Sequence, residues 1–283
     1  MRRNIFEILS EDFDVEREIY IIFQLFKNTF ISVTNNPLQA NTMHLLDFVD
    51  LYSFKKWKAR NRCVSTQDMM ERLGINFDSS FIGFAELTTE ILIYLEFIVN
   101  MIKRYDTVRI EGAVAVRGNY ELLKENINIL LENFGYTTYY YEDEQKVVII
   151  EKDPATISVA EISEPETAKK IIQYNHYTLK GKIDEKKDII IALASELEPQ
   201  RREIEQINSQ LETHLFFMFN NMNLRHNNKD LNDKKQYKPF VAKMNDHELE
   251  QWYDETYQMI LLAKLLLDNK ERQDRIIDLK KNF

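Results

Sequence analysis

Glycine and proline are scarce in this chain, and their scarcity limits the folds that it can adopt. The 283 residues include 6 Gly and 5 Pro. These two residues supply most of the geometry of tight turns, so an all-β fold with many short strands is disfavoured. Hydrophobic residues make up 44% of the chain and charged residues 29%, a balance typical of a globular protein and not of a disordered tail or a membrane span. We therefore predict a mainly α-helical fold.

The first part of the chain, 1–104, is predicted to be a helical N-terminal region. Apolar residues recur there at intervals of three and four, which is the period of one face of a helix. A Ser or Thr that can cap a helix precedes one of these segments, and Gly74 ends it. The predicted helices cover 15–29, 43–60, about 65–74 and 81–104.

The middle of the chain, 105–160, is predicted to be a small α+β element. A helix over 120–134 ends at Gly135, and a β-hairpin follows over 136–152, because residues that favour strands flank a polar turn there. Since a lone two-stranded hairpin is only marginally stable, 108–116 is a candidate for a third strand beside it.

The last part, 161–283, is predicted to be an up-and-down helical bundle. Asn245 has the position of a helix cap, and Glu248, three residues later, completes a capping box. The loop 227–244 is long and polar, as functional or disordered loops often are. The predicted helices cover 165–180, 184–198, 204–219 and 246–267.

A polar run between the last two helices holds the main candidate site. It begins with Arg225, His226 and Asn227, directly after an apolar helical face. One interpretation is purely structural, because a cation is favourable at the C-terminal end of a helix and asparagines commonly end helices. The other interpretation is a functional site.

This arrangement resembles the HEPN superfamily, small all-α domains found in abortive-infection and toxin–antitoxin proteins. The resemblance covers about 165–268 and rests on a helix that ends in Arg225 and His226, a loop, and a long apolar last helix. The family signature is Arg, often followed by Asn or His, and a second His after four to six residues. Here that second position falls on Asp230, Leu231 or Asn232, which leaves His226 itself, His214 or His247 as substitutes.

The resemblance implies an RNA-binding protein or metal-independent endoribonuclease in phage defence or a toxin–antitoxin type of system. RNA carries its own nucleophile, the 2′-hydroxyl, so the protein would supply a proton shuttle and a cation that stabilises the phosphorane. His226 would be the shuttle, Arg225 the cation, and Asn227 an orienting group. His214 is a further candidate, because eleven residues are about three helical turns. Glu196 and Glu198 could face the same site.

A second candidate for RNA binding is the most basic stretch of the chain. It contains five cations and one tryptophan within eight residues, and single-stranded nucleic acid is bound by cations that reach phosphates and aromatic rings that stack on bases. The structural alternative is a solvated helix end with the tryptophan as a core anchor. The residues are Lys55, Lys56, Trp57, Lys58, Arg60 and Arg62.

Composition also limits the cellular compartment and the binding partners that we expect for this protein. The single cysteine, Cys63, excludes an internal disulfide, and we expect no metal site, no cofactor, no membrane span and a cytoplasmic location. A net charge of −9 disfavours non-specific binding to DNA or acidic lipid. The resemblance further implies a homodimer or higher oligomer through the C-terminal helix, and a possible partner or antitoxin protein. The competing function is a non-catalytic helical sensor, adaptor or phage–host interaction protein.

Overall fold

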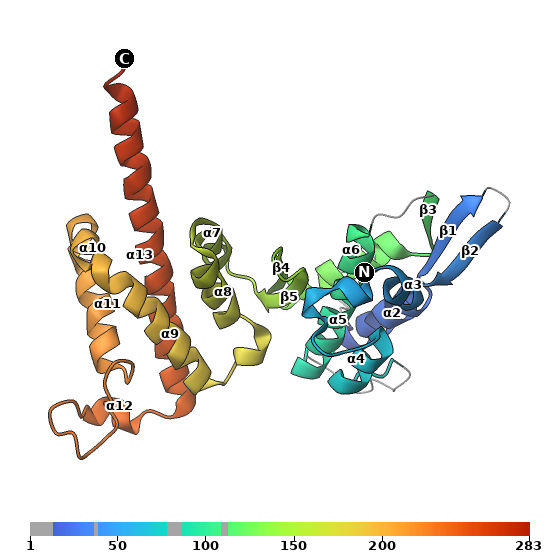
Figure 1. Cartoon of the computed structure of the whole chain (residues 1–283). Helices are drawn as coiled ribbons and strands as arrows, with labels where there is room; N and C mark the ends of the chain where they lie inside the picture. The colour runs from blue at the N-terminus through green and yellow to red at the C-terminus, as the bar shows by residue number, and fades with distance from the viewer. Residues whose placement is uncertain (1–13, 37–38, 78–86, 109–112) are drawn as a thin grey trace, which may run out of the picture. The chain divides into compact units, whose positions relative to one another are not determined.

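The computed structural model describes residues 14–36, 39–77, 87–108 and 113–283. The described elements fall into two compact units, Met1–Lys152 and Asp153–Phe283 (Figure 1). Most of the described residues are helical, so the mainly α-helical class predicted from the sequence is confirmed. The division into three parts at 104 and 160 stays a prediction.

The helices of the first unit pack around α5, which has buried residues on more than one side. Thr88 caps α5 by accepting from the Ile91 amide, and the ring of Tyr94 stacks on Phe23 of α2 at 5.4 Å between centroids. The predicted start of this helix at Phe81 lies outside the described residues. The bounds are α2 Val15–Lys27, α3 Leu45–Tyr52, α4 Thr66–Leu73, α5 Thr89–Thr107 and α6 Tyr120–Asn133, with the 3-10 turns η1 Phe54–Lys56 and η2 Lys58–Arg60.

A three-stranded antiparallel sheet interrupts the region that was predicted to be helical. Its order is β2–β1–β3, with bounds β1 Phe30–Asn36, β2 Gln39–His44 and β3 Ala113–Arg117. The strand predicted at 108–116 therefore exists in part, but the predicted partner is wrong, because β3 pairs with β1 and not with the later hairpin. After β3 the chain turns at Gly118, whose φ of +91° and approach to the Asn28 carbonyl leave no room for a Cβ atom.

The predicted hairpin over 136–152 is confirmed as β4 Tyr136–Tyr141 and β5 Lys146–Glu151. Helix α5 takes the place of a third strand at the edge of β5. The Asn100 side chain accepts from the Val147 amide at 2.8 Å and donates to the Val147 carbonyl at 2.7 Å, and Glu96 accepts from the Ile149 amide at 2.8 Å. These bonds satisfy backbone groups that burial would otherwise leave unpaired.

The regular elements described in the second unit are all helices, joined by loops of which 222–238 is the longest (Figure 1). The capping box of Asn245 and Glu248 is present at the start of α13, but the helix runs to Lys280, well beyond the predicted end at 267. The helix predicted over 204–219 is divided at Asn208, whose side chain caps α11. The bounds are α7 Pro154–Ile162, α8 Pro165–Tyr174, η3 Tyr177–Leu179, α9 Ile183–Leu197, η4 Glu198–Gln200, α10 Arg201–Ile207, α11 Ser209–Asn221, α12 Pro239–Lys243 and α13 Asp246–Lys280.

The core of the second unit centres on α13, against which α7, α9, α10 and α11 pack. Tyr257 is buried, its ring stacks on Tyr174 at 4.0 Å, and its hydroxyl donates to the Ile171 carbonyl at 2.9 Å. These contacts tie α8 to α13. Among the described residues, no helix has both the length and the apolar character needed to cross a membrane.

Candidate functional site

Helix α11 ends before it reaches the predicted site. Asn221 is its last helical residue, Asn223 has the left-handed φ of +58°, and the Arg225 amide donates back to the Phe219 carbonyl at 3.0 Å. That bond satisfies one of the carbonyls that a helix end leaves without a partner. Because Arg225 and His226 lie in the turn and not on the helix, helical spacing does not force their side chains apart.

The Arg225 guanidinium is held by a carboxylate and two aromatic rings. It donates to Glu198 in η4, and its central carbon lies 5.0 Å from the ring centroid of Phe219 and 5.4 Å from that of Phe216. The side chain is 23% exposed. A cation over a ring face is attracted by the ring's quadrupole, so these contacts fix the guanidinium while part of it stays open to solvent.

The neighbouring side chains are less constrained. His226 is half-buried, and within the described part of the chain its imidazole has no hydrogen-bond or ion-pair partner. Asn227 is exposed, and its carbonyl accepts from the Asp230 amide at 3.2 Å. The structure therefore brings Arg225, His226 and Asn227 together in one turn, with the imidazole free to meet a ligand.

Asn228, which was not among the predicted site residues, organises this turn. It is completely buried, and its side-chain oxygen accepts from the Asn223 amide at 2.7 Å. Its side-chain nitrogen donates to the Gln236 carbonyl at 2.7 Å, and its backbone carbonyl accepts from the Lys238 amide at 2.9 Å. These bonds fold the polar loop back onto the end of α11.

The other predicted members of this site lie in different places. His214 is exposed on α11, two residues from Phe216 and so about 200° around the helix from the ring that Arg225 covers. The structure therefore does not place His214 on the side of α11 that holds Arg225. Glu196 accepts a hydrogen bond from Thr167 and forms an ion pair with Lys170. Glu198, in contrast, forms an ion pair with Arg225.

The basic stretch in the first unit uses several of its side chains for packing. Trp57 is 4% exposed, and its indole N–H donates to the Gln145 carbonyl in the β4–β5 turn at 2.7 Å. Lys58 donates to the Asp143 carbonyl at 3.1 Å in the same turn. The prediction that Trp57 stacks on a base is not compatible with this geometry, because the ring anchors the hairpin.

Arg60 is also engaged, since it donates to the Cys63 carbonyl at 2.7 Å and to the Lys55 carbonyl at 3.3 Å. Lys55, Lys56 and Arg62 are exposed. These three cations are the members of the stretch that remain open to a phosphate backbone.

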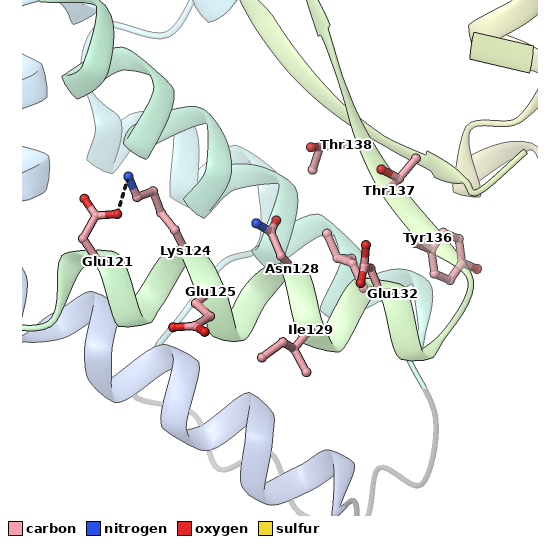
Figure 2. A pocket seen from close by; sticks show the side chains of 10 residues that line it. Glu121, Lys124, Glu125, Asn128, Ile129, Glu132, Tyr136, Thr137 and Thr138 are labelled. Atoms are coloured by element: carbon pink, nitrogen blue, oxygen red, sulfur yellow. Dashed lines mark ion pairs between the residues drawn. The ribbon is translucent and has the colours of Figure 1, made fainter. Parts of the chain in front are cut away.

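A cavity of about 690 Å³ lies between α6 and β4 in the first unit (Figure 2). Its charged lining consists of Glu121, Glu125, Glu132 and Lys124, and Lys124 pairs with Glu121 at 2.9 Å. The excess of carboxylates makes this cavity unsuited to a phosphate group. Over the described residues, no cluster of three or more His, Cys, Asp or Glu side chains could hold a metal ion.

Comparison with protein-family models, with curated proteins and with solved structures found no match to this chain.

Proposed function

We propose that the protein binds RNA at the Arg225–His226 turn and cleaves it without a metal ion, in a phage-defence or toxin–antitoxin type of system. The observation that carries this proposal is the unpartnered His226 imidazole beside a guanidinium that is held in place. The biological setting rests on the resemblance to HEPN domains alone.

The two side chains have the chemistry that cleavage at a 2′-hydroxyl needs. Histidine exchanges a proton near neutral pH, so His226 can accept the proton of the attacking hydroxyl or donate one to the leaving oxygen. A guanidinium has five N–H donors, and Glu198 leaves several of those of Arg225 free for a phosphate oxygen. A fixed cation stabilises the charge that develops on the phosphorane without reorganising during the reaction.

A second candidate function is a non-catalytic sensor or adaptor that works through protein–protein contacts. The favouring observation is that Glu198, Phe216 and Phe219 engage Arg225 within the chain itself. In that case the arginine would fasten the end of α11 to η4, and the turn would have no substrate.

The test compares cultures that express the wild type and the Arg225→Ala, His226→Ala double variant. We expect the wild type to arrest growth and to fragment total RNA, and the double variant to do neither. Arg202→Ala is the matched control, because Arg202 is an exposed arginine on α10, outside the turn; it should behave as the wild type. Circular dichroism establishes that all variants are folded.

Purified protein then separates catalysis from an indirect effect on cells. Cleavage of RNA in the presence of EDTA, lost in the double variant, is the expected result. If the wild type and the double variant act alike in cells and on RNA, the turn serves only to end a helix. The non-catalytic sensor or adaptor is then the better assignment, and the ribonuclease is rejected.

A further inference from the structure

One edge of strand β4 has no pairing partner among the described residues. In its two-stranded sheet β4 pairs with β5 alone, and the other edge of β5 is occupied by side chains of α5. Residues directly opposite each other in an antiparallel pair either bond to each other or both turn their backbone groups outward. Because Ile149 turns its amide to α5, its partner Thr138 turns its own N–H and carbonyl away from β5.

Three residues of β4 have backbone groups that point outward in this way. The Lys152 amide donates to the Gly135 carbonyl at 2.7 Å, which fixes the phase of the alternation and adds Tyr136 and Tyr140 to Thr138. Within the described part of the chain, no hydrogen bond reaches the backbone N–H and carbonyl groups of these three residues. All residues of β4 are partly exposed, so the unpaired groups are within reach of an incoming strand.

The sequence of β4 lacks the features that usually protect an exposed edge. Natural proteins place Lys, Pro or a β-bulge on such strands, which prevents pairing with another chain. The strand Tyr136–Tyr141 consists of Tyr and Thr, residues that favour strands, and its register with β5 contains no bulge. Strand β4 is therefore suited to accept a further strand.

The free edge borders the cavity between α6 and β4, which we call the α6–β4 groove. It is lined by the first three residues of β4 and by one side of α6 (Figure 2). Three carboxylates and one ammonium group line it, and within the described residues Glu125 has no ion pair. Glu151, which lies opposite Tyr136 in the hairpin, is exposed and adds a further negative charge beside that residue. The groove therefore favours a ligand with positive charges.

We propose that the free edge of β4 and the α6–β4 groove bind an extended segment of another protein that is rich in Lys or Arg. The segment adds to the sheet as a strand, so that main-chain hydrogen bonds supply affinity and its cations meet the carboxylates of the groove. A strand rises about 3.3 Å per residue, so about five residues span the outward-facing part of β4.

Charge argues against a second copy of this chain as the occupant. Pairing β4 with β4 of another copy would bring two acidic grooves together, and like charges placed against each other weaken an interface. The surface belongs to the first unit, so this proposal is independent of the proposed RNA cleavage at the Arg225–His226 turn.

The first test is calorimetric titration of the full chain with a short, end-blocked synthetic peptide in which Lys and Val alternate. We expect the wild type to bind this peptide and Glu125→Lys to bind it about tenfold more weakly, because like charges then meet in the groove. Glu205→Lys is the matched control, since it makes the same change of net charge at an exposed position of α10, and it should bind as the wild type does. Absence of binding to the wild type, or equal weakening by both substitutions, overturns the proposal.

Amide hydrogen exchange, followed residue by residue by NMR, tests whether the peptide adds as a strand. In the free chain the amides of Thr137 and Tyr139 should exchange slowly, because they face β5, and those of Thr138 and Tyr140 should exchange fast. Saturating peptide should slow exchange at Thr138 and Tyr140 by at least about tenfold.

Two results of this exchange experiment contradict the proposal. If Thr138 and Tyr140 stay unprotected while the peptide is bound, the peptide binds through charge alone. If they are already protected in the free chain, the edge is occupied without a partner protein, and a sedimentation mass of two chains would identify the occupant as a second copy.

Discussion

At the scale of single residues, two adjacent asparagines in the candidate turn have opposite roles. Asn228 is completely buried and bonds to the Asn223 amide and the Gln236 carbonyl, whereas Asn227 is exposed. Removing the Asn228 side chain leaves a half-buried donor at Asn223 and a half-buried acceptor at Gln236 without these bonds, each at a cost of about 1–3 kcal/mol. The fold of the turn that presents His226 therefore depends on this one amide.

We expect Asn228→Ala to lower the free energy of unfolding by about 2–4 kcal/mol in urea denaturation. Asn227→Ala is the matched control and should change it by less than about 0.5 kcal/mol, as is usual for surface substitutions. Equal effects of the two substitutions would show that the turn is not held by the Asn228 side chain.

Local chemistry was predictable at this scale, and distant contacts were not. The capping box of Asn245 and Glu248 follows from a spacing of three residues, and the structure contains it. The place of Arg225 at the end of an apolar helix could also be predicted. The role of Asn228 could not, because it depends on a loop that returns at Gln236, and the burial of Trp57 depends on Gln145, which is 88 residues away.

At the scale of elements, Glu196 joins three helices of the second unit. It lies on α9, accepts from Thr167 at 2.7 Å, and pairs with Lys170 at 2.9 Å and with Lys264 of α13 at 3.4 Å. Burial by itself raises the pKa of the Glu196 carboxyl, but the hydrogen bonds and the two ammonium groups outweigh it and hold this pKa below the ordinary value of 4.5.

The sign of the pH dependence follows from this lowered pKa. The unfolded chain takes up the Glu196 proton more readily than the folded chain does, so the stabilisation is complete above about pH 4.5 and is lost as the pH falls through the lower folded pKa. We expect Glu196→Gln to lower the free energy of unfolding by about 1 kcal/mol at neutral pH and to lose this deficit in acid.

Denaturant unfolding at several pH values measures this effect. Glu205→Gln is the control, because Glu205 is exposed on α10, and it should follow the wild type at every pH. A deficit for Glu196→Gln that stays the same in acid and at neutral pH would show that the carboxylate charge is not what joins the helices.

The strands show which elements could be predicted from the sequence and which could not. The β4–β5 hairpin could be predicted because its residues favour strands and flank a polar turn. The β1–β2 hairpin was not predicted, although its two strands are neighbours in the sequence. Strand β3 was predicted with the wrong partner, because its pairing with β1 joins segments about eighty residues apart. The hairpin does not need a third strand, since Asn100 and Glu96 of α5 satisfy the edge of β5.

At the scale of the whole molecule, the two compact units each hold a core of their own. The Arg225–His226 turn belongs to 153–283, while the exposed cations Lys55, Lys56 and Arg62 belong to 1–152. The proposed RNA cleavage should therefore be separable from the first unit. The sequence predicted that the hairpin ends at 152, but it did not predict that the first compact unit extends from the start of the chain to this point, because that depends on which elements pack together.

We expect the fragment 153–283, expressed alone, to give a helical circular dichroism spectrum and a cooperative thermal transition. The physical reason is that its core and its capping box lie within the fragment. The fragment 1–152 should also unfold cooperatively, because it holds a core of its own. If 153–283 is unfolded by itself, its helices depend on the first unit, and the boundary does not separate two independently folding domains.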